Sequence, residues 1–260
     1  MGQSQSDMEL AQAATNGDLA HVQALLAQGA SPNATKWGYS ALYNATWSRH
    51  LGVIECLLAA GADVNYGGST KGGALFQAAN KGYLETVSLL LAKGALVNGR
   101  DPTLNTPLWT AAHHGNADVV DRLLLANANV HRCNDRGETP LFAAAAGGHA
   151  RIVTSLLAAG ANVHQGDNQG ITPLVEAAAA GHADVVAILL EANVTIECTA
   201  RGPMVAAVTR NHTDVVLLLC RAIVARADTE ARRRGNVDSS DDLSDETVLA
   251  HEPSRSAKEA

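Results

Sequence analysis

The sequence contains few aromatic residues, and this scarcity limits the kind of core that it can form. Aromatic residues make up 3% of the 260 residues, whereas hydrophobic residues make up 47%, with alanine prominent among them. Small side chains let helices pack closely together, but they cannot fill one wide core. We therefore expect an elongated molecule whose core is spread along the chain.

The sequence also lacks paired cysteines and long apolar runs. Its four cysteines are far apart and form no Cys-x-x-Cys pair, and no apolar signal segment stands at its start. No stretch approaches the roughly 18 uncharged apolar residues that a transmembrane helix needs. This pattern is typical of a reduced intracellular compartment. We expect the cytoplasm, with the nucleus or a peripheral membrane position as alternatives.

Catalytic motifs are missing as well. The sequence contains no G-x-S-x-G, P-loop, H-E-x-x-H or dinucleotide-binding pattern. His131 lies close to Cys133, but no recognisable motif adds an acid that would orient the pair. The net charge of −7 argues against a nucleic-acid partner, because phosphate contacts need clustered Lys and Arg. We expect no enzyme, no cofactor and no nucleic-acid binding.

Internal repetition is the strongest feature that the sequence does have. A leucine recurs every 33 residues, at Leu42, Leu75, Leu108, Leu141 and Leu174, and a Thr-Pro pair precedes the last three. Threonine caps a helix by accepting a hydrogen bond from a free N–H, and proline in the first helical position loses none. A fixed period of this length predicts a linear array of similar helical units.

Each unit contains the signals of two helices. The first helix ends near a glycine in most units. The second follows within two residues, often with an acidic residue in its first turn, and then an apolar stripe. Arg49 and Asn211 replace the glycine in two units. Asparagine suits a left-handed helix cap but Arg49 does not, so we expect a strained or rearranged turn there.

This pattern resembles the ankyrin repeat, which reads G-x-T-P-L-H-x-A-A-x-x-G-H and then V-V-x-L-L-x-x-G-A-D-V-N. The resemblance covers about residues 10–221, in seven copies. It implies an all-α solenoid of stacked helix-turn-helix units with β-hairpin-like finger loops. It also implies a non-enzymatic adaptor, scaffold or inhibitor that binds another protein, and we expect a monomer.

The chain departs from the family at the histidine that follows Thr-Pro-Leu. Tyr43, Phe76, Trp109, Phe142 and Val175 stand at that position instead. Because the aromatic residues keep the repeat spacing, we interpret them as a packing seam between repeats. The alternative interpretation is a ligand groove.

Histidines recur at a different position, directly after the turn between the two helices. A residue type that recurs at one position indicates a structural role, so we expect no metal site there. His131 and His164 are also one repeat apart, but stacked helices lie about 8–10 Å from each other, too far for both rings to bind one zinc ion. The recurring histidines are His50, His149, His182 and His212.

The boundaries follow from these signals. Residues 1–9 are predicted to be a polar, disordered leader, and residues 10–234 the repeat array. The last helix is expected to extend to residue 234 as a cap, because three arginines there precede a glycine. Residues 235–260 are polar, acidic in their first half, and predicted to be a disordered tail. The repeats span about 10–33, 34–65, 66–98, 99–131, 132–164, 165–197 and 198–222.

The resemblance places the partner surface on one concave face, formed by the finger tips and the outward residues of the first helices. Trp37, Tyr39 and Trp47 are the sharpest candidates, because helical packing does not require aromatic residues there and Trp and Tyr are enriched at interface hot spots. The alternative is that these rings pack on one another to support repeat two. We expect the partner to engage repeats two to four. The predicted contact residues are Lys36, Trp37, Tyr39, Trp47, Asn80, Lys81, Thr103, Asn105, His113, His114 and Arg136.

Two alternative functions use the ends of the chain. The start matches M-G-x-x-x-[ST], so Gly2 is a candidate for N-myristoylation and a membrane scaffold is the second hypothesis. No neighbouring cysteine or basic run supplies the second signal that stable anchoring needs. The third hypothesis is a regulatory subunit whose acidic tail folds on a basic partner. Membrane contact is expected only with the lipid.

Overall fold

The structure is a computed structural model that describes residues 5–66, 72–192, 194–196, 199 and 201–237. It divides into two compact units, Met1–Leu219 and Cys220–Ala260. Helix α14 (Thr213–Val237) begins in the first unit, and its later residues belong to the second. The predicted lipidation site, Gly2, and residues 238–260 of the predicted tail lie outside the described residues.

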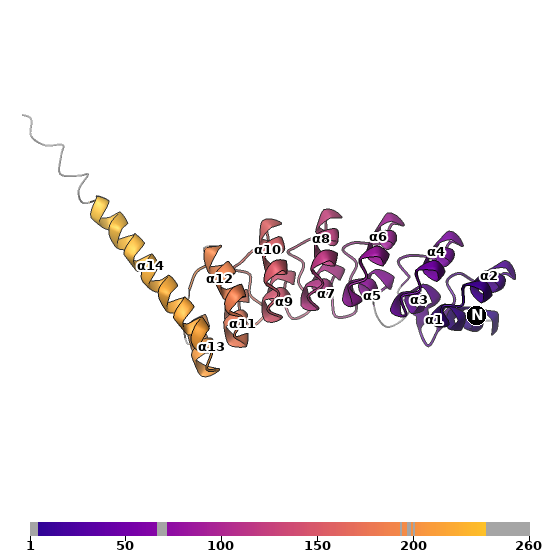
Figure 1. Ribbon diagram of the computed structural model, residues 1–260, viewed down its shortest axis with the longest axis horizontal. Helices are drawn as coiled ribbons and strands as arrows, with labels where there is room; N and C mark the ends of the chain where they lie inside the picture. Colours follow the sequence, from indigo (N-terminus) through magenta and orange to yellow (C-terminus); the bar gives the residue numbers. More distant parts are fainter. Residues whose placement is uncertain (1–4, 67–71, 193, 197–198, 200, 238–260) are drawn as a thin grey trace, which may run out of the picture. The chain divides into compact units, whose positions relative to one another are not determined.

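The helices of the first unit follow one another in pairs along a row, as Figure 1 shows. The two helices of a pair contact each other, and first helices contact their neighbours along the row. The predicted all-α repeat fold is confirmed. The first helices are α1 (Gln5–Asn16), α3 (Ala41–Trp47), α5 (Ala74–Lys81), α7 (Pro107–His113), α9 (Pro140–Ala146), α11 (Pro173–Ala180) and α13 (Pro203–Thr209). The second helices before α14 are α2 (Leu19–Ala27), α4 (Leu51–Ala59), α6 (Leu84–Ala92), α8 (Ala117–Leu125), α10 (Ala150–Ala158) and α12 (Ala183–Glu191).

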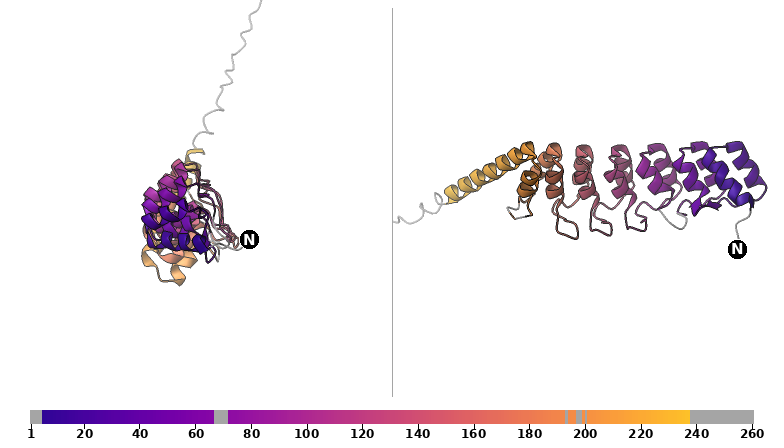
Figure 2. Two further views of the ribbon diagram at one scale, coloured as in Figure 1. Left: turned by 90° about the vertical axis from the view of Figure 1, so that its right-hand side faces the viewer. Right: turned by 90° about the horizontal axis from the view of Figure 1, so that it is seen from below.

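The loops between pairs form fingers, which project from the same side of the row in Figure 2. The finger of repeat two is a short antiparallel hairpin, in which β1 (Thr35–Lys36) pairs with β2 (Tyr39–Ser40). These are the only two strands within the described residues. A hairpin finger is therefore found in repeat two, while side-chain hydrogen bonds shape the fingers of repeats four to six.

The recurring leucines lie in the core of the array, and each is at most 4% exposed. The apolar stripes of the second helices are buried too, as Val119 and Leu123 show in α8. Buried alanines such as Ala111 let neighbouring first helices approach closely. The buried residues form one cluster that extends from Leu10 to Leu219, so each repeat shares its core with its neighbours.

Polar side chains cap most of the first helices as predicted. The Oγ1 atoms of Thr106 and Thr139 each accept a hydrogen bond of 3.1 Å from the backbone N–H three residues later. Ser40 makes the same bond in α3. Gly73 and Gly202 precede α5 and α13 without a side-chain cap. The helices of repeats three and seven therefore begin with less support.

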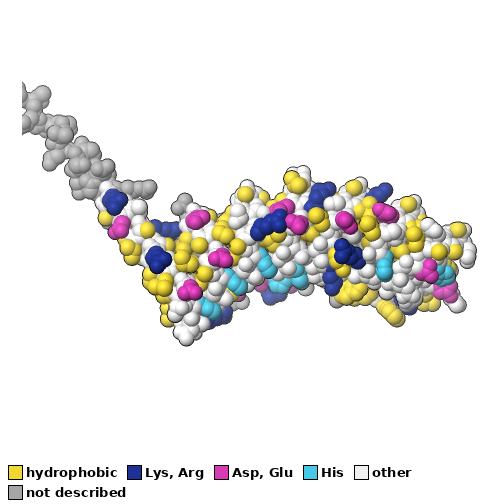
Figure 3. Space-filling view, viewed as in Figure 1, with side chains coloured by type: hydrophobic (Ala, Val, Ile, Leu, Met, Phe, Trp, Pro, Cys, Tyr) yellow, Lys and Arg dark blue, Asp and Glu magenta, His cyan; other side chains and the backbone are white. Residues whose placement is uncertain are grey.

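Each of the four recurring histidines connects its repeat to the one before it. The Nε2 atoms of His182 and His212 both lie 3.0 Å from a backbone carbonyl oxygen at the end of the preceding first helix. His50 and His149 make equivalent contacts at 3.2 and 3.3 Å. Asn116 replaces histidine in repeat four and donates to two such carbonyls. Histidine side chains are visible at intervals along the array in Figure 3. These contacts explain why the residue type recurs.

The first helix begins earlier than predicted. Helix α1 starts at Gln5, so residues 5–9 are helical where the sequence predicted a disordered leader. Asp7 lies in the first turn, where a carboxylate favours the positive end of the helix dipole. It also accepts a hydrogen bond of 2.9 Å from the Ser31 N–H. Both interactions extend the helix past the apolar residues on which the prediction was based.

The last helix ends later than predicted. Helix α14 runs to Val237, so residues 235–237 are helical, although the prediction assigned them to the tail. A glycine inside a helix costs about 1 kcal/mol relative to alanine, which the strong helix formers before it can offset. None of the described helices has both the length and the apolar character that crossing a membrane requires.

Candidate functional site

Most of the predicted contact residues lie on the fingers and first helices of repeats two to four. We call this surface the finger face, and among the described residues it comprises residues 35–48, 72–81 and 99–114. Arg136 lies outside it, in the finger of repeat five. The predicted residues differ in how they are held, and these differences decide which of them are free to meet a ligand.

Trp37 is the most exposed large apolar residue of the described chain, at 83%. It stands in the turn of the β1–β2 hairpin, where Trp37 and Gly38 have φ angles of 53° and 82°. Two consecutive left-handed residues are typical of a type I′ hairpin turn, which prefers Asn-Gly and disfavours bulky residues. A tryptophan kept in this conformation and left in water indicates a role outside the core.

Three aromatic rings follow one another from the finger of repeat two along α3. The ring centroids of Tyr39 and Tyr43 are 4.8 Å apart and those of Tyr43 and Trp47 are 6.5 Å apart, with interplanar angles of 20° and 26°. Tyr43 is 6% exposed, whereas Trp47 is 52% exposed. Tyr39 and Tyr43 therefore support the packing of repeat two, and about half of Trp47 remains in water.

A lysine ammonium group lies over each of the two exposed tryptophans. Lys36 Nζ is 4.4 Å from the ring centroid of Trp37, and Lys81 Nζ is 4.5 Å from that of Trp47. Contacts of this kind contribute about 0.5–1 kcal/mol at exposed sites. Lys36 also donates a hydrogen bond to the Gln12 side chain in α1. The structure thus brings four of the predicted residues into two cation–aromatic pairs.

Repeat four presents an aromatic residue together with two histidines. The Trp109 ring stacks on His113 with centroids 4.9 Å apart and an interplanar angle of 12°. The His114 ring meets His113 edge-on, and its Nδ1 lies 2.9 Å from the Thr110 carbonyl oxygen. Burial, and then the neighbouring His114, lower the pKa of His113 from its usual value. At neutral pH His113 therefore presents an uncharged ring.

Thr103 and Asn105 hold the shape of their own finger. Their backbone N–H groups donate to Asp101 Oδ1 at 3.0 and 2.8 Å, and Asn105 Nδ2 donates to Asp101 Oδ2 at 3.1 Å. Asn134 and Asp167 accept the equivalent pair of backbone bonds in repeats five and six. The sequence prediction missed these three turn-forming residues. Their spacing of 33 residues was the available signal.

Two further predicted contact residues, Arg136 and Asn80, already interact with neighbouring side chains. Arg136 is exposed, and its Nη1 lies 3.5 Å from Glu138 Oε1, so a neighbouring carboxylate offsets part of its charge. Asn80 is half-buried at the end of α5, and its carbonyl oxygen accepts a hydrogen bond of 2.9 Å from Asn116. Both positions offer less to a ligand than the two lysine–tryptophan pairs do.

Three buried polar side-chain atoms of the described residues lack a hydrogen-bond partner, and all three belong to repeats three and four. They are Gln77 Nε2, Asn105 Oδ1 and Trp109 Nε1. Gln77 is 4% exposed and Trp109 is 7% exposed. A buried polar group left unpaired costs about 1–3 kcal/mol. The prediction did not include Gln77, although a glutamine where repeat five has Ala143 was a signal for it.

Charge also distinguishes the finger face. Its described residues include Lys36, Lys81 and Arg100 and only one carboxylate, Asp101. The equivalent stretches of repeats five and six, residues 132–147 and 165–180, carry two arginines and four carboxylates. The finger face is therefore positively charged in a chain whose net charge is −7.

The histidines considered as metal ligands and the candidate nucleophile Cys133 do not come together in one metal site among the described residues. No group of three or more His, Cys, Asp or Glu residues that could hold a metal ion occurs among the described residues. Cys133 is a free, half-buried cysteine in the finger of repeat five. His113 and His114 meet edge-on with centroids 5.0 Å apart, in an arrangement that serves stacking on Trp109.

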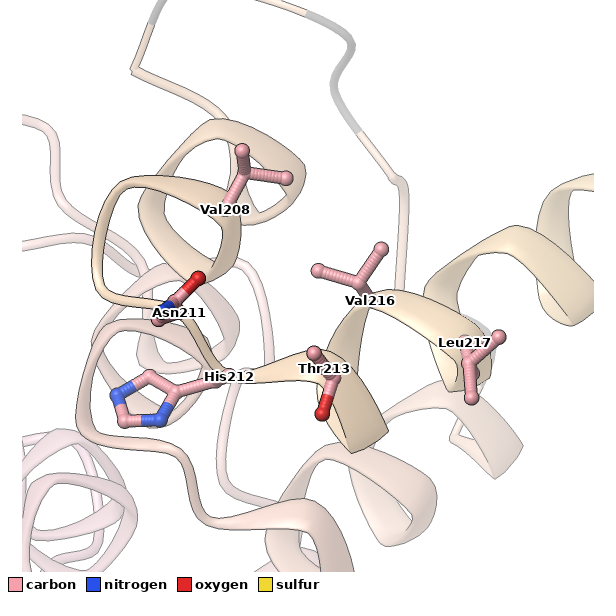
Figure 4. A pocket seen from close by; sticks show the side chains of 6 residues that line it. All are labelled: Val208, Asn211, His212, Thr213, Val216 and Leu217. Carbon is pink, nitrogen blue, oxygen red and sulfur yellow. The ribbon is translucent and has the colours of Figure 1, made fainter.

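A pocket lies at the last helix pair of the first unit. Helix α13, the turn after it and the start of α14 line a pocket of about 430 Å³, shown in Figure 4. Val208, Val216 and Leu217 make the lining largely apolar. In Figure 4 the His212 ring points away from Val216 and Leu217, in agreement with its contact to the preceding repeat. We interpret this pocket as the open stacking surface of the last pair.

Comparison with models of protein families agrees with the repeat pattern. A model described as ankyrin repeats in three copies matches residues 75–167, 108–200 and 161–233. A model described as ankyrin repeats in many copies matches residues 10–58. A search among curated proteins found no match. The matched residues include most of the finger face as well as repeats five and six.

Proposed function

Because the chain belongs to the ankyrin repeat family, we propose that it binds another protein through the finger face, with the contact centred on repeats two to four. Ankyrin repeats generally mediate protein–protein interaction, and the family is typically non-enzymatic. The observation that carries the proposal is the exposure of Trp37 and Trp47, at 83% and 52%, on neighbouring parts of one surface. Tryptophan is enriched among the residues that dominate interface energies.

The two tryptophans are held in place before any partner arrives. The hairpin turn positions Trp37, and stacking on Tyr43 positions Trp47. Lys36 and Lys81 restrict the rings further. A surface that is already ordered loses little conformational entropy on binding. These features support a rigid adaptor, scaffold or inhibitor whose partner binds the concave side of the array.

Affinity purification with mass spectrometry tests the proposal. The wild-type chain is compared with the double variant Trp37→Ala, Trp47→Ala. We expect recovery of the partner to fall at least tenfold, because truncating a hot-spot residue costs about 2 kcal/mol or more. The matched control is Leu125→Ala, which removes another exposed apolar side chain, 79% exposed at the end of α8.

Circular dichroism and thermal unfolding accompany this experiment. The double variant should keep the helical spectrum and nearly the same melting temperature as the wild type. If the variant retains the partner, or if its melting temperature falls as far as its binding, the aromatic residues serve packing and the proposal is wrong.

A further inference from the structure

The two exposed tryptophans and the excess of positive charge occur on the same surface. We propose that the finger face binds an acidic peptide segment of the partner protein. In this arrangement, ligand carboxylates lie near Lys36 and Lys81. The inference rests on the proposed function and adds the chemistry of the bound segment.

The lysines determine the sign of the ligand's charge. Their ammonium groups already occupy the positions over Trp37 and Trp47, at 4.4 and 4.5 Å from the ring centroids. A cationic ligand such as a methylated lysine would compete for these positions and would be repelled. The aromatic rings of repeat two are also stacked at 20° and 26°, rather than arranged around a cavity as in an aromatic cage.

The one carboxylate among the described residues of the finger face, Asp101, is held by its own turn. Asp101 Oδ1 accepts bonds from the Thr103 N–H, the Thr103 hydroxyl and the Asn105 N–H. Asp101 Oδ2 accepts a further bond from the Asn105 amide. With this carboxylate committed to the turn, the charge of the lysines remains available to a ligand carboxylate.

A single-stranded nucleic acid fits these observations less well than a peptide. Nucleic-acid grooves combine a run of cations along the backbone with open aromatic faces on which bases stack. Here the described finger face carries three Lys or Arg residues, and lysines cover the exposed rings. The charge suffices for two or three carboxylates of a peptide.

Selection from a phage-displayed library of random linear peptides on the full chain tests the inference. We expect the enriched peptides to contain an excess of Asp and Glu over the starting library. Their affinities are then measured by fluorescence polarisation with synthetic labelled peptides. Lys36→Glu combined with Lys81→Glu should weaken binding about tenfold or more. The matched control, Lys93→Glu combined with Arg132→Glu, reverses two exposed charges outside the finger face and should change binding less than twofold.

Other outcomes also contradict the inference. Enrichment of neutral or basic peptides would overturn it, as would lysine-dependent binding of a labelled random single-stranded DNA in place of peptides. Peptides that bind only a chain truncated after Val237 would identify the chain's own acidic tail as the occupant, against a partner segment. If the partner is lost with Trp37→Ala, Trp47→Ala but the selected peptides are not acidic, the proposed function stands and this inference is wrong.

Discussion

Left-handed backbone positions are filled differently in two parts of the array. In repeats two to four, the residues with positive φ include Trp37, Arg49, Leu104 and Asn127. In repeats five and six, every described residue with positive φ is a glycine. In repeat five, Gly148, Gly137 and Gly160 take the positions of Arg49, Leu104 and Asn127, also with positive φ. A side chain in this conformation costs about 1–2 kcal/mol unless it is glycine or asparagine.

This difference indicates that the two parts serve different purposes. Repeats two to four keep bulky side chains in unfavourable conformations, and on the same fingers and helices they keep unpaired donors and a positive charge. Repeats five and six satisfy their turns and offer Ala146 and Gly147 where a binding helix would present reaching side chains. Strain is therefore concentrated where we propose that the partner binds, and repeats five and six act as a regular scaffold.

The largest expected effect is a loss of stability caused by a core substitution in repeat five. Leu141→Ala in repeat five removes a fully buried side chain and should lower the free energy of unfolding by about 3 kcal/mol. Urea unfolding followed by circular dichroism measures this loss, with the exposed Leu125→Ala as the control that should change little. At a temperature where the variant keeps its native spectrum, partner recovery should be unchanged. A lost partner under those conditions would mean that repeat five takes part in binding.

A smaller effect tests the backbone strain directly. Gly137 has a φ of 80°, and a Cβ atom there would lie 2.4 Å from Asn168 Oδ1 and 2.7 Å from Asn168 N. Gly137→Ala should therefore destabilise the array by about 2 kcal/mol. Leu104 has a φ of 62° and is 40% exposed, so Leu104→Gly should stabilise it by about 1 kcal/mol. Urea midpoints of both variants measure the difference, and changes of the same sign would contradict it.

The smallest effect concerns pH. Burial and the neighbouring His114 lower the pKa of His113, with further lowering by His149 and Arg136 and an opposing effect of Glu138. As the pH falls through the ordinary histidine value of about 6.5, the unfolded chain binds a proton more readily than the folded chain, so stability falls. His113→Gln removes this contribution.

Urea midpoints measured at about pH 7.5 and 5.5 for both proteins check the prediction. The wild type should lose more stability on acidification than His113→Gln does. An equal loss in the two proteins would show that His113 does not contribute, and a larger loss in the variant would reverse the predicted sign.

Much of the fold follows from the sequence because the same physical requirements repeat. The Thr-Pro pair begins a helix wherever it occurs, and the leucine after it is buried each time. The histidine after the turn indicated its structural role through repetition alone. The ends of the array's first and last helices were less predictable. The start of α1 at Gln5 and the end of α14 at Val237 depend on single polar contacts and helix propensity, because the apolar pattern does not extend to these residues.

The finger face was predictable in position but less so in detail. Trp37 and Trp47 stand out in the sequence because nothing in the repeat requires them. The sequence does not reveal that Thr103 and Asn105 hold their own turn, since that depends on where the Asp101 carboxylate points. It also does not reveal the unpaired nitrogen of Gln77, because whether a polar atom finds a hydrogen-bond partner depends on its neighbours in the folded structure.

The contacts made by the recurring histidines all run in one direction along the chain. His50, His149, His182 and His212 each reach from a later repeat to the helix end of an earlier one. During synthesis from the N-terminus, the first helix of repeats one, four, five and six therefore has an unfinished end until the next repeat emerges and supplies its imidazole. Repeat three waits in the same way for Asn116. The array is asymmetric in this respect, because these repeats are completed by their successors.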